Sequence, residues 1–254
     1  MCTANILLNL FILWVFKYYN FYISSFEDTF LGGDNYGLLL NLILPIGISF
    51  YTFQALSYSM DVYRNKIESP RDVISFSAFV SFFPQLVAGP IERTTNLLPQ
   101  FLKPRHFDYT SAVDGMRQML WGFFKKIVIA DNCAVYVNRV FDNYTIESGS
   151  TLLVGAIFFS IQIYCDFSGY SDIAIGTSRL FGINLMRNFN FLYFNRDIAE
   201  FWRRWHISLT TGFRDYIYIP LGGSRVCRLQ IIRNTFIIFL ISGFWHGANL
   251  NFIV

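Results

Sequence analysis

The sequence predicts an all-α, polytopic membrane protein, and its composition and uncharged stretches support this fold class. Apolar residues make up 54% of the chain and aromatic residues 19%, whereas charged residues make up 15%, below the roughly 25% of soluble domains. Five long stretches carry no formal charge: Met1–Phe16, Asn35–Met60, Val73–Ile91, Ser148–Cys165 and Asn234–Val254. A soluble domain with a single core rarely contains several uncharged runs of about 20 residues, so a soluble fold is the minor alternative.

The charge, cysteine and histidine patterns exclude other classes of protein. The formal net charge is only +3, and the spread of basic residues fits cytoplasmic loops better than a nucleic-acid-binding surface. The four cysteines have no paired spacing, so they predict neither a disulfide framework nor a zinc site. The three histidines, His106, His206 and His246, lie far apart and form no His-Glu-x-x-His pattern. We therefore expect no metal and no nucleic-acid partner.

The N-terminal third is expected to contain two spans. Residues 4–23 form the first, and Lys17 near its end is expected to reach the membrane interface. The acidic loop that follows lacks lysine and arginine, which places it outside. The second span is Leu38–Tyr58, kinked by Pro45 and Gly47, and basic residues after it indicate the cytoplasmic side.

The next apolar stretch, Val73–Ile91, is interrupted by Pro84, Gly89 and Pro90. Proline removes a helical hydrogen bond, so a straight helix is not expected beyond Pro84. Irregular backbone at membrane depth survives only where it is buried in protein or lines a cavity. A re-entrant segment is therefore favoured, and a short span that ends at a polar loop remains open.

Two helices are expected in the middle of the chain. Asp114–Ala130 is predicted to be helical and partly interfacial, and whether it crosses the membrane stays open, because two lysines interrupt its apolar pattern. Thr151–Tyr164 begins a long helix that turns polar between Asp166 and Asp172. These two carboxylates either line a water-filled cavity as part of a substrate site or cap and cross-link helices through hydrogen bonds.

The basic region Arg179–Arg233 contains nine arginines and three acidic residues, which places it in the cytoplasm by the positive-inside rule. Asp197 is expected to open a helix, because a carboxylate complements the exposed N–H groups of a first turn. Beyond it an apolar stripe recurs at i, i+4 and i+8, formed by Phe201, Trp205 and Leu209. This pattern predicts an interfacial amphipathic helix, with His206 on an adjacent face, that ends by Pro220.

The last uncharged stretch, Asn234–Val254, is expected to run from inside to outside and to carry His246 near its middle. At about 1.5 Å per residue its 21 residues are long enough to cross a bilayer core. A titratable ring inside an apolar span is costly, so His246 is a functional-site candidate.

Three sequence blocks resemble a known family. They are FFPQLVAGPIER at 82–93, FWRRWHISL at 201–209 continued by FRDYIYIPLGG at 213–223, and GFWHGA at 243–248. In this order and spacing they resemble the membrane-bound O-acyltransferase (MBOAT) family, in particular the bacterial branch of alginate O-acetyltransferase membrane subunits. The D-alanyl transfer protein of teichoic acid modification is a more distant cousin. The resemblance covers essentially the whole chain.

The resemblance implies a helical bundle around a transmembrane tunnel in the bacterial inner membrane. An acyl thioester, acetyl-CoA or another, is presented on the cytoplasmic side, and the acyl group passes to an exported polysaccharide such as alginate. A separate extracytoplasmic transferase of the SGNH type commonly completes delivery to the sugar in this branch. The alternatives are D-alanyl transfer to a teichoic acid-type polymer and, from another class, a transporter with an intramembrane proton relay.

The resemblance also implies roles for individual residues. His246 takes the position of the family's catalytic histidine, next to Trp245 in the substrate site, and His206 takes that of the second signature residue. His246 is then the general base for the acceptor hydroxyl or a transient acyl acceptor; the plain alternative is a buried histidine that bonds a neighbouring helix. His206 either lines the tunnel mouth or is an ordinary interfacial histidine. Three arginines attract either phosphates of the thioester donor or anionic lipid; they are Arg203, Arg204 and Arg214.

Two features depart from the family pattern. Gly212 stands where this branch usually has a tryptophan, which affects the packing of the interfacial helix. Family members also carry further spans before and after this region. We therefore expect residues 1–254 to be a single partial MBOAT-type transmembrane domain, the central fragment of a longer protein.

Overall fold

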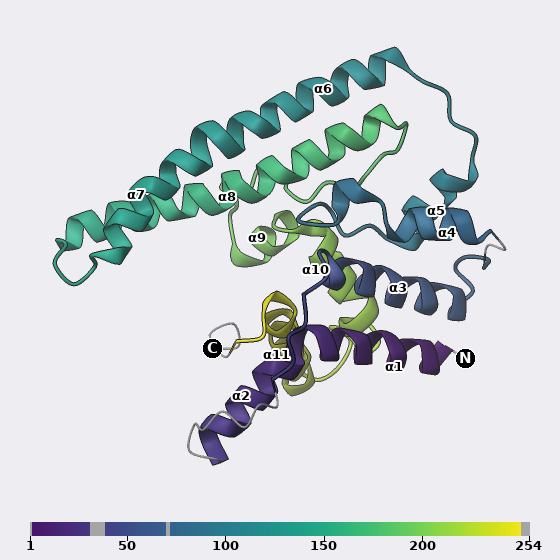
Figure 1. Ribbon diagram of the computed structural model, residues 1–254, viewed down its shortest axis with the longest axis horizontal. Helices are drawn as coiled ribbons and strands as arrows, with labels where there is room; N and C mark the ends of the chain where they lie inside the picture. The colour runs from purple at the N-terminus through teal and green to yellow at the C-terminus, as the bar shows by residue number, and fades with distance from the viewer. Residues whose placement is uncertain (1, 31–38, 70–71, 250–254) are drawn as a thin grey trace. The chain divides into compact units, whose positions relative to one another are not determined.

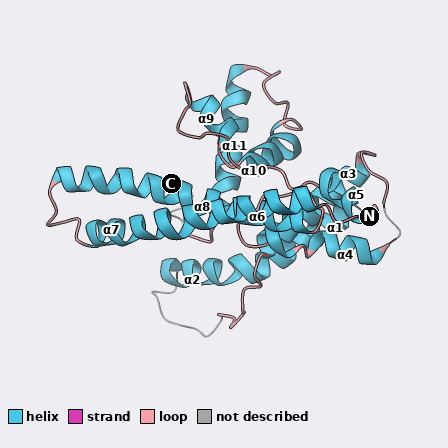
Figure 2. Cartoon of the chain, turned by 90° about the horizontal axis from the view of Figure 1, so that it is seen from above, coloured by secondary structure: helices cyan, strands magenta, loops and turns pink. Residues whose placement is uncertain are grey.

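The computed structural model describes residues 2–30, 39–69 and 72–249, and all regular elements within these ranges are helical (Figure 1, Figure 2). The all-α prediction is therefore confirmed for the described residues. The chain divides into two compact units. The first comprises Met1–Ser81, Arg93–Thr95 and Leu209–Val254, and the second comprises Phe82–Glu92 and Asn96–Ser208.

The first unit begins with one long apolar helix and continues with shorter ones. Its elements are α1 (Cys2–Leu13), the π-helical turn η1 (Trp14–Tyr18), α2 (Tyr19–Phe30), α3 (Ile48–Tyr63), α4 (Val73–Val80), most of α10 (Ile207–Phe213), the π-helical turn η4 (Arg214–Tyr218) and α11 (Arg228–His246). Helices α1 and α3 lie side by side (Figure 1). Near the end of α1, Leu13, Tyr18 and Ile48 form a small buried cluster, against which Phe244 of α11 packs.

Two of the predicted spans are helical over a shorter range than expected. The stretch predicted as Leu38–Tyr58 is non-helical from residue 39 to residue 47, and its helix starts at Ile48. Leu38 itself lies outside the described residues. Pro45 and Gly47 therefore precede the helix instead of kinking it. Gly47 has φ 78°, a left-handed conformation that glycine adopts freely and that a right-handed helix cannot include.

The final helix also differs from the prediction. Helix α11 starts earlier, at Arg228, and ends at His246, where Gly247 becomes extended. His246 therefore lies at the C-terminal end of a helix, not near its middle. Residues 250–254 lie outside the described part of the chain.

The second unit is built around a pair of long antiparallel helices. One continuous rod contains α6 (Tyr109–Phe123), the π-helical segment η3 (Phe124–Ala130) and α7 (Asp131–Asp142), and it runs along α8 (Gly149–Leu180) (Figure 2). The remaining elements are the 3₁₀ turn η2 (Phe83–Gln85), most of α5 (Thr94–Leu102) and α9 (Ile198–Arg204). The break expected at Pro84 is present, because α4 ends at Val80 and only the short η2 follows.

Local sequence signals explain where these helices begin. Asp108 accepts hydrogen bonds from the backbone N–H groups of Thr110 and Ser111 at 3.1 and 3.2 Å, and Ser148 caps α8 in the same way. Side-chain acceptors at this position satisfy N–H groups that have no partner within the helix. Asp197 caps α9 through the Glu200 N–H at 2.6 Å, as predicted.

Close packing of the two long helices depends on four glycines. On α6 and α8, Gly115 faces Gly176 and Gly122 faces Gly169. A Cβ atom built on any of these four glycines would lie 2.5–2.8 Å from the backbone oxygen of its partner, a distance that real contacts do not reach. Small residues allow helix backbones to approach closely, and membrane helices use them for this purpose.

Two described helices are long and apolar enough to cross a membrane, namely Cys2–Glu27 and Gly149–Leu180. They expose large apolar side chains: Leu7 and Phe11 on the first are 62% and 59% exposed, and Leu153 on the second is 65% exposed. Exposed apolar stripes along such helices are what a lipid-facing surface requires.

Candidate active site

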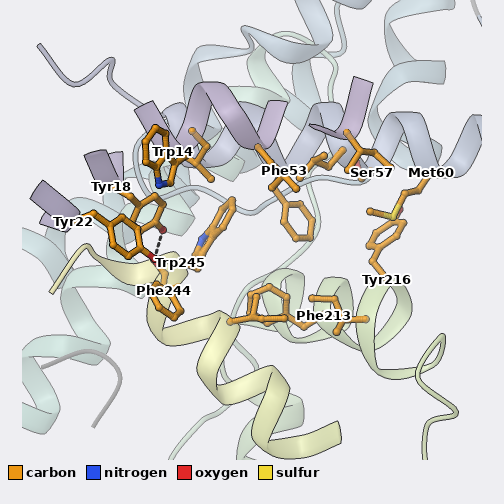
Figure 3. A pocket seen from close by; sticks show the side chains of 16 residues that line it. Trp14, Tyr18, Tyr22, Phe53, Ser57, Met60, Phe213, Tyr216, Phe244 and Trp245 are labelled. Atoms are coloured by element: carbon orange, nitrogen blue, oxygen red, sulfur yellow. Dashed lines mark hydrogen bonds between the residues drawn. The ribbon is translucent and has the colours of Figure 1, made fainter. Parts of the chain in front are cut away.

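Two side chains of η1 hold the end of α11 that carries His246. Lys17 Nζ donates a hydrogen bond to the backbone oxygen of Trp245 at 2.5 Å and to Ser49 Oγ at 3.0 Å. The Tyr18 hydroxyl donates to the backbone oxygen of Phe244 (Figure 3). The expectation that Lys17 reaches the membrane interface stays a prediction. In the described chain its ammonium group satisfies a carbonyl at a helix C-terminus, where the last carbonyls lack partners and the helix dipole favours a cation.

The predicted substrate residue Trp245 lies on the wall of an apolar cavity of about 520 Å³ in the first unit (Figure 3). Its ring meets Phe53 edge to face, with ring centroids 5.5 Å apart. Phe53 also contacts Gly212, where an added Cβ would lie 2.6 Å from the Phe53 ring. A tryptophan at position 212 would therefore displace Phe53, so the Phe53 ring fills part of the space that a larger residue would need. His246 does not line this cavity, and its side chain is exposed in the described chain.

Arg214 forms part of a charge cluster that the sequence did not reveal. Arg214 Nε lies 2.7 Å from Asp215 Oδ1, and Arg93 Nη1 lies 2.5 Å from Asp215 Oδ2. Burial of Asp215 acts to raise the pKa of this carboxyl, but hydrogen bonds and charges from Arg214 and Arg93 outweigh it and hold the pKa below its usual range. The neighbouring Tyr216 hydroxyl donates to Asp61 Oδ2 at 2.7 Å.

His206 lies in the second unit, at a break between two helices. The apolar stripe of Phe201, Trp205 and Leu209 predicted one amphipathic helix, but α9 ends at Arg204 and α10 starts at Ile207. The single-helix prediction is therefore wrong at this point, because His206 has φ 44°, which interrupts a right-handed helix. A non-glycine residue in this conformation stores about 1–3 kcal/mol of strain, and such residues are frequent at functional sites.

The His206 ring is buried and fixed by specific contacts. It lies perpendicular to Phe167, with ring centroids 4.7 Å apart, and its Nδ1 lies 3.4 Å from Ser208 Oγ. The Ser208 hydroxyl donates to Asn188 Oδ1 at 2.6 Å. Asn188 in turn donates to Ser171 Oγ of α8 at 3.2 Å.

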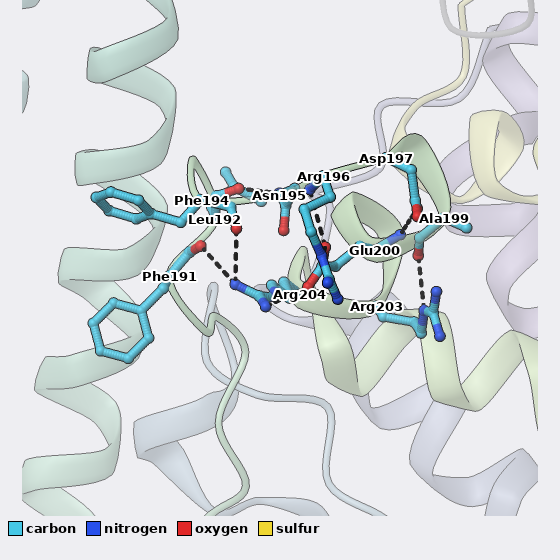
Figure 4. Close-up of polar contacts among 10 residues, drawn as sticks. All are labelled: Phe191, Leu192, Phe194, Asn195, Arg196, Asp197, Ala199, Glu200, Arg203 and Arg204. Carbon is cyan, nitrogen blue, oxygen red and sulfur yellow. Dashed lines mark hydrogen bonds and ion pairs between the residues drawn. The ribbon is translucent and has the colours of Figure 1, made fainter.

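The two other predicted arginines, Arg203 and Arg204, differ in their polar contacts (Figure 4). Arg204 forms an ion pair with Glu200 and donates to the backbone oxygens of Phe191 and Phe194 at 3.4 and 3.2 Å. The backbone N–H and guanidinium of Arg196, together with Arg204, hold the pKa of Glu200 below its usual range. Arg203 is exposed, and within the described ranges it donates to the backbone oxygen of Ala199 alone.

The carboxylates Asp166 and Asp172 both pair with lysines of η3. Asp166 bonds Lys126, and Asp172 bonds Lys125 and accepts from Gln118 Nε2 at 2.8 Å. The cross-linking alternative therefore describes their geometry. Asp172 also lines a polar cavity in the second unit, so for this residue the substrate-site alternative stays a prediction.

The structure brings the predicted site residues into two groups. His246, Trp245 and Arg214 lie in the first unit, and His206, Arg203, Arg204, Asp166 and Asp172 lie in the second. Sequence patterns did not identify Lys17, Tyr18, Arg93 or Asp215 as members of these groups. For Lys17 alone the sequence contains a signal of such a role, because a cation buried within an apolar span requires a partner.

The chain is similar to proteins of known family over almost its whole length. Residues 7–254 match the profile of MBOAT, the membrane-bound O-acyltransferase family. A protein of Pseudomonas aeruginosa named probable alginate O-acetylase AlgI is 43% identical over 251 residues, which is 98% of this chain and 48% of that protein. A peptidoglycan O-acetyltransferase of Helicobacter pylori is 39% identical over 98% of this chain and 52% of that protein.

A teichoic acid D-alanyltransferase of Bacillus subtilis is 28% identical over 84% of this chain and 56% of that protein. The chain thus spans about half of the length of the curated relatives that it matches. The match of residues 7–254 covers far more than half of this chain. We conclude that the chain is a polytopic membrane protein that belongs to the membrane-bound O-acyltransferase family.

Proposed function

We propose that this chain forms part of a membrane O-acyltransferase that passes an acetyl group from a cytoplasmic thioester donor across the membrane to an exported polysaccharide such as alginate. The observation that supports this proposal is the 43% identity to the alginate O-acetylase of Pseudomonas aeruginosa over 98% of the chain. Acetyl-CoA or another acyl thioester is the donor, and an SGNH-type extracytoplasmic transferase is the partner that delivers the group to the sugar. The protein lies in the bacterial inner membrane.

The reaction assigns His246 the role of general base. His246 takes the proton of the acceptor hydroxyl as the oxygen attacks the thioester carbonyl. The tetrahedral intermediate then collapses, the carbon–sulfur bond breaks, and the leaving thiolate takes the proton back from the histidine. The products are an oxygen ester and a free thiol, so atoms and charge balance and the step needs no metal.

The same proposal gives roles to the other predicted residues. The helices surround a tunnel, with the segment around Pro84 re-entrant and the region of α9 and α10 at the interface. Buried His206 supports the cytoplasmic end of this tunnel. Trp245 contacts the acyl group from the wall of the apolar cavity. Among the predicted anion ligands Arg203 is the best placed, because Arg204 and Arg214 already pair with acidic residues.

The test is to express the complete reading frame that encodes this chain in an alginate-producing bacterium whose own alginate O-acetylase gene is deleted. Mass spectrometry of the exported polymer is expected to show restored acetyl esters. Esters of D-alanine on the cell-surface polymer would instead support the activity named for the Bacillus subtilis relative. Proton flux through the purified protein with no ester on any polymer would support the transporter alternative.

Loss of the Lys17 contact is expected to slow acyl transfer without weakening donor binding. In a Lys17→Met variant the backbone oxygen of Trp245 loses its donor, and the helix end that carries His246 becomes less fixed. Small misplacements of catalytic groups reduce rates strongly, so we expect kcat to fall about 10-fold while KM for the donor is unchanged. Steady-state kinetics of the purified protein measure both quantities.

Two further variants separate positioning by Lys17 from a general loss of structure. Lys17→Arg keeps a donor and a positive charge and should restore much of kcat. Lys103→Met removes an exposed lysine that follows α5 and should change neither quantity. A Lys17→Met variant whose KM rises with kcat unchanged would show that Lys17 does not position His246.

A further inference from the structure

The second unit contains a polar cavity of about 330 Å³ that the residues discussed so far only border. Its walls are formed by the facing sides of α6–η3 and α8 and by the loop from residue 187 to residue 191. Four charged side chains line it: Lys125, Asp172, Arg179 and Arg187. The volume is sufficient for a phosphate group and part of the molecule that bears it, at the lower end of typical ligand sites.

The charges in this cavity are not balanced. Lys125 pairs with Asp172, so these two residues compensate each other. Among the described residues neither Arg179 nor Arg187 forms an ion pair or hydrogen bond through its guanidinium, in contrast to Arg204 and Arg214. Arg179 is half-buried and Arg187 exposed, so the cavity presents two uncompensated guanidinium groups at its edge.

The neutral lining adds hydrogen-bond donors and flat rings. Ser168, Asn188 and Asn190 supply polar groups, and Trp121 and Phe189 supply aromatic faces. Guanidinium groups bind phosphate oxygens in a two-pronged geometry and prefer phosphate to neutral ligands. A lining of this kind suits an organic phosphate better than an apolar acyl chain.

The walls of the cavity are held rigidly. The glycine contacts between α6 and α8 fix two of its sides. On the third side Asn188 bonds Ser171 and Ser208, and Ser208 contacts His206. These buried residues form a continuous chain from the predicted tunnel residue His206 to the cavity wall. A preformed site of this kind loses little free energy to ordering when a ligand binds.

We propose that this cavity binds the phosphate-bearing end of the acyl-thioester donor, with Arg179 and Arg187 as its anion ligands. The proposal rests on the proposed acyltransferase function and narrows the donor to a phosphorylated thioester, such as a coenzyme A or phosphopantetheine thioester. Neither arginine is among the residues that the sequence motifs identified, because both lie outside the three blocks. The phosphate of an anionic lipid has the same chemistry and is the competing source.

The experiment measures binding of coenzyme A and of pantetheine, which lacks phosphate, to the protein from the complete reading frame in phosphatidylcholine nanodiscs. Isothermal titration calorimetry is expected to show coenzyme A binding at least about 10-fold more tightly than pantetheine, since charge-assisted hydrogen bonds to phosphate are lost. Arg179→Gln and Arg187→Gln should each weaken coenzyme A binding about 10-fold and leave pantetheine binding unchanged. Arg187→Lys, which keeps the charge, should weaken it less.

The matched control is Arg117→Gln, which removes a 77% exposed arginine on α6 that pairs with Asp114 and should leave coenzyme A binding unchanged. Equal binding of coenzyme A and pantetheine, or unchanged binding in Arg179→Gln and Arg187→Gln, would overturn the proposal. Displacement of coenzyme A by phosphatidylglycerol in the nanodisc, with the same arginine dependence, would assign the cavity to lipid and also overturn it. Acetylation of the polymer by the unchanged protein reports separately on the proposed function.

Discussion

An alanine at position 246 is expected to reduce acyl transfer to the polysaccharide by about 10²- to 10⁴-fold, the usual contribution of a general base. The hydroxyl of a sugar is a weak nucleophile until its proton is removed, and within the described part of the chain His246 is the histidine that follows the tryptophan of the GFWHGA block. The measurement is the acetyl content of polymer made by cells that express the complete reading frame with His246→Ala. Equal protein levels in the membrane fraction must be confirmed by immunoblot.

The matched control is His106→Ala, because His106 lies in the exposed segment between α5 and α6. It should acetylate the polymer as well as the unchanged protein does. His206 offers an internal comparison, since Asn tolerates a positive φ better than Ala does. We expect His206→Asn to retain more protein and more activity than His206→Ala. Full acetylation by the His246→Ala variant would contradict the assignment of the general base.

The surroundings of His246 show which parts of the site sequence reasoning could reach. The cost of a titratable ring in an apolar stretch identified His246, and the GFWHGA block identified both His246 and Trp245. Lys17 and Tyr18, which bond the two carbonyls just before His246, lie more than 220 residues away along the chain. No periodicity within either segment could pair them. Their contact depends on tertiary packing, which a single sequence does not encode locally.

The region around His206 shows a local sequence pattern that predicted one continuous helix where the structure has a break. The spacing of Phe201, Trp205 and Leu209 is correct for an amphipathic helix, and Asp197 does cap its first turn. The pattern failed because Trp205 is extended and His206 adopts a positive φ. Hydrogen bonds to the loop at Asn188 stabilise the break. Local propensity cannot predict a conformation that distant contacts impose, and such exceptions are expected at functional sites.

The starts of helices could be predicted from local sequence, whereas the packing between helices could not. Carboxylate and hydroxyl caps at Asp108, Ser148 and Asp197 are local signals, and they begin helices in the structure. The close approach of α6 and α8 is not a local signal, although its glycines are visible in the sequence at positions 115, 122, 169 and 176. Spacing by seven residues on both helices becomes informative only after the two helices are known to face each other.

Replacing Gly176 by alanine is expected to lower the stability of the protein strongly, although alanine is the better helix former. The change from glycine to alanine in a helix gains about 1 kcal/mol of intrinsic propensity. At Gly176, however, the new Cβ would lie 2.5 Å from the backbone oxygen of Gly115 and 2.6 Å from the Met119 side chain. Overpacking costs about 1–3 kcal/mol or more, and a backbone oxygen in a long helix cannot move aside alone. We expect the loss to exceed the gain.

Gly149→Ala is the matched control, because Gly149 opens the same helix and has no atom within 4 Å of an added Cβ. Thermal unfolding of the protein in detergent should give a lower Tm for Gly176→Ala and an unchanged or slightly higher Tm for Gly149→Ala. Gly115→Ala should lower the Tm similarly, and the double variant should lose less than the sum, because one substitution already separates the helices. Additive losses, or a Gly176→Ala variant as stable as Gly149→Ala, would contradict this packing. The separation would also move Lys125 on η3 away from Asp172 on α8, so coenzyme A binding should weaken in Gly176→Ala and not in Gly149→Ala.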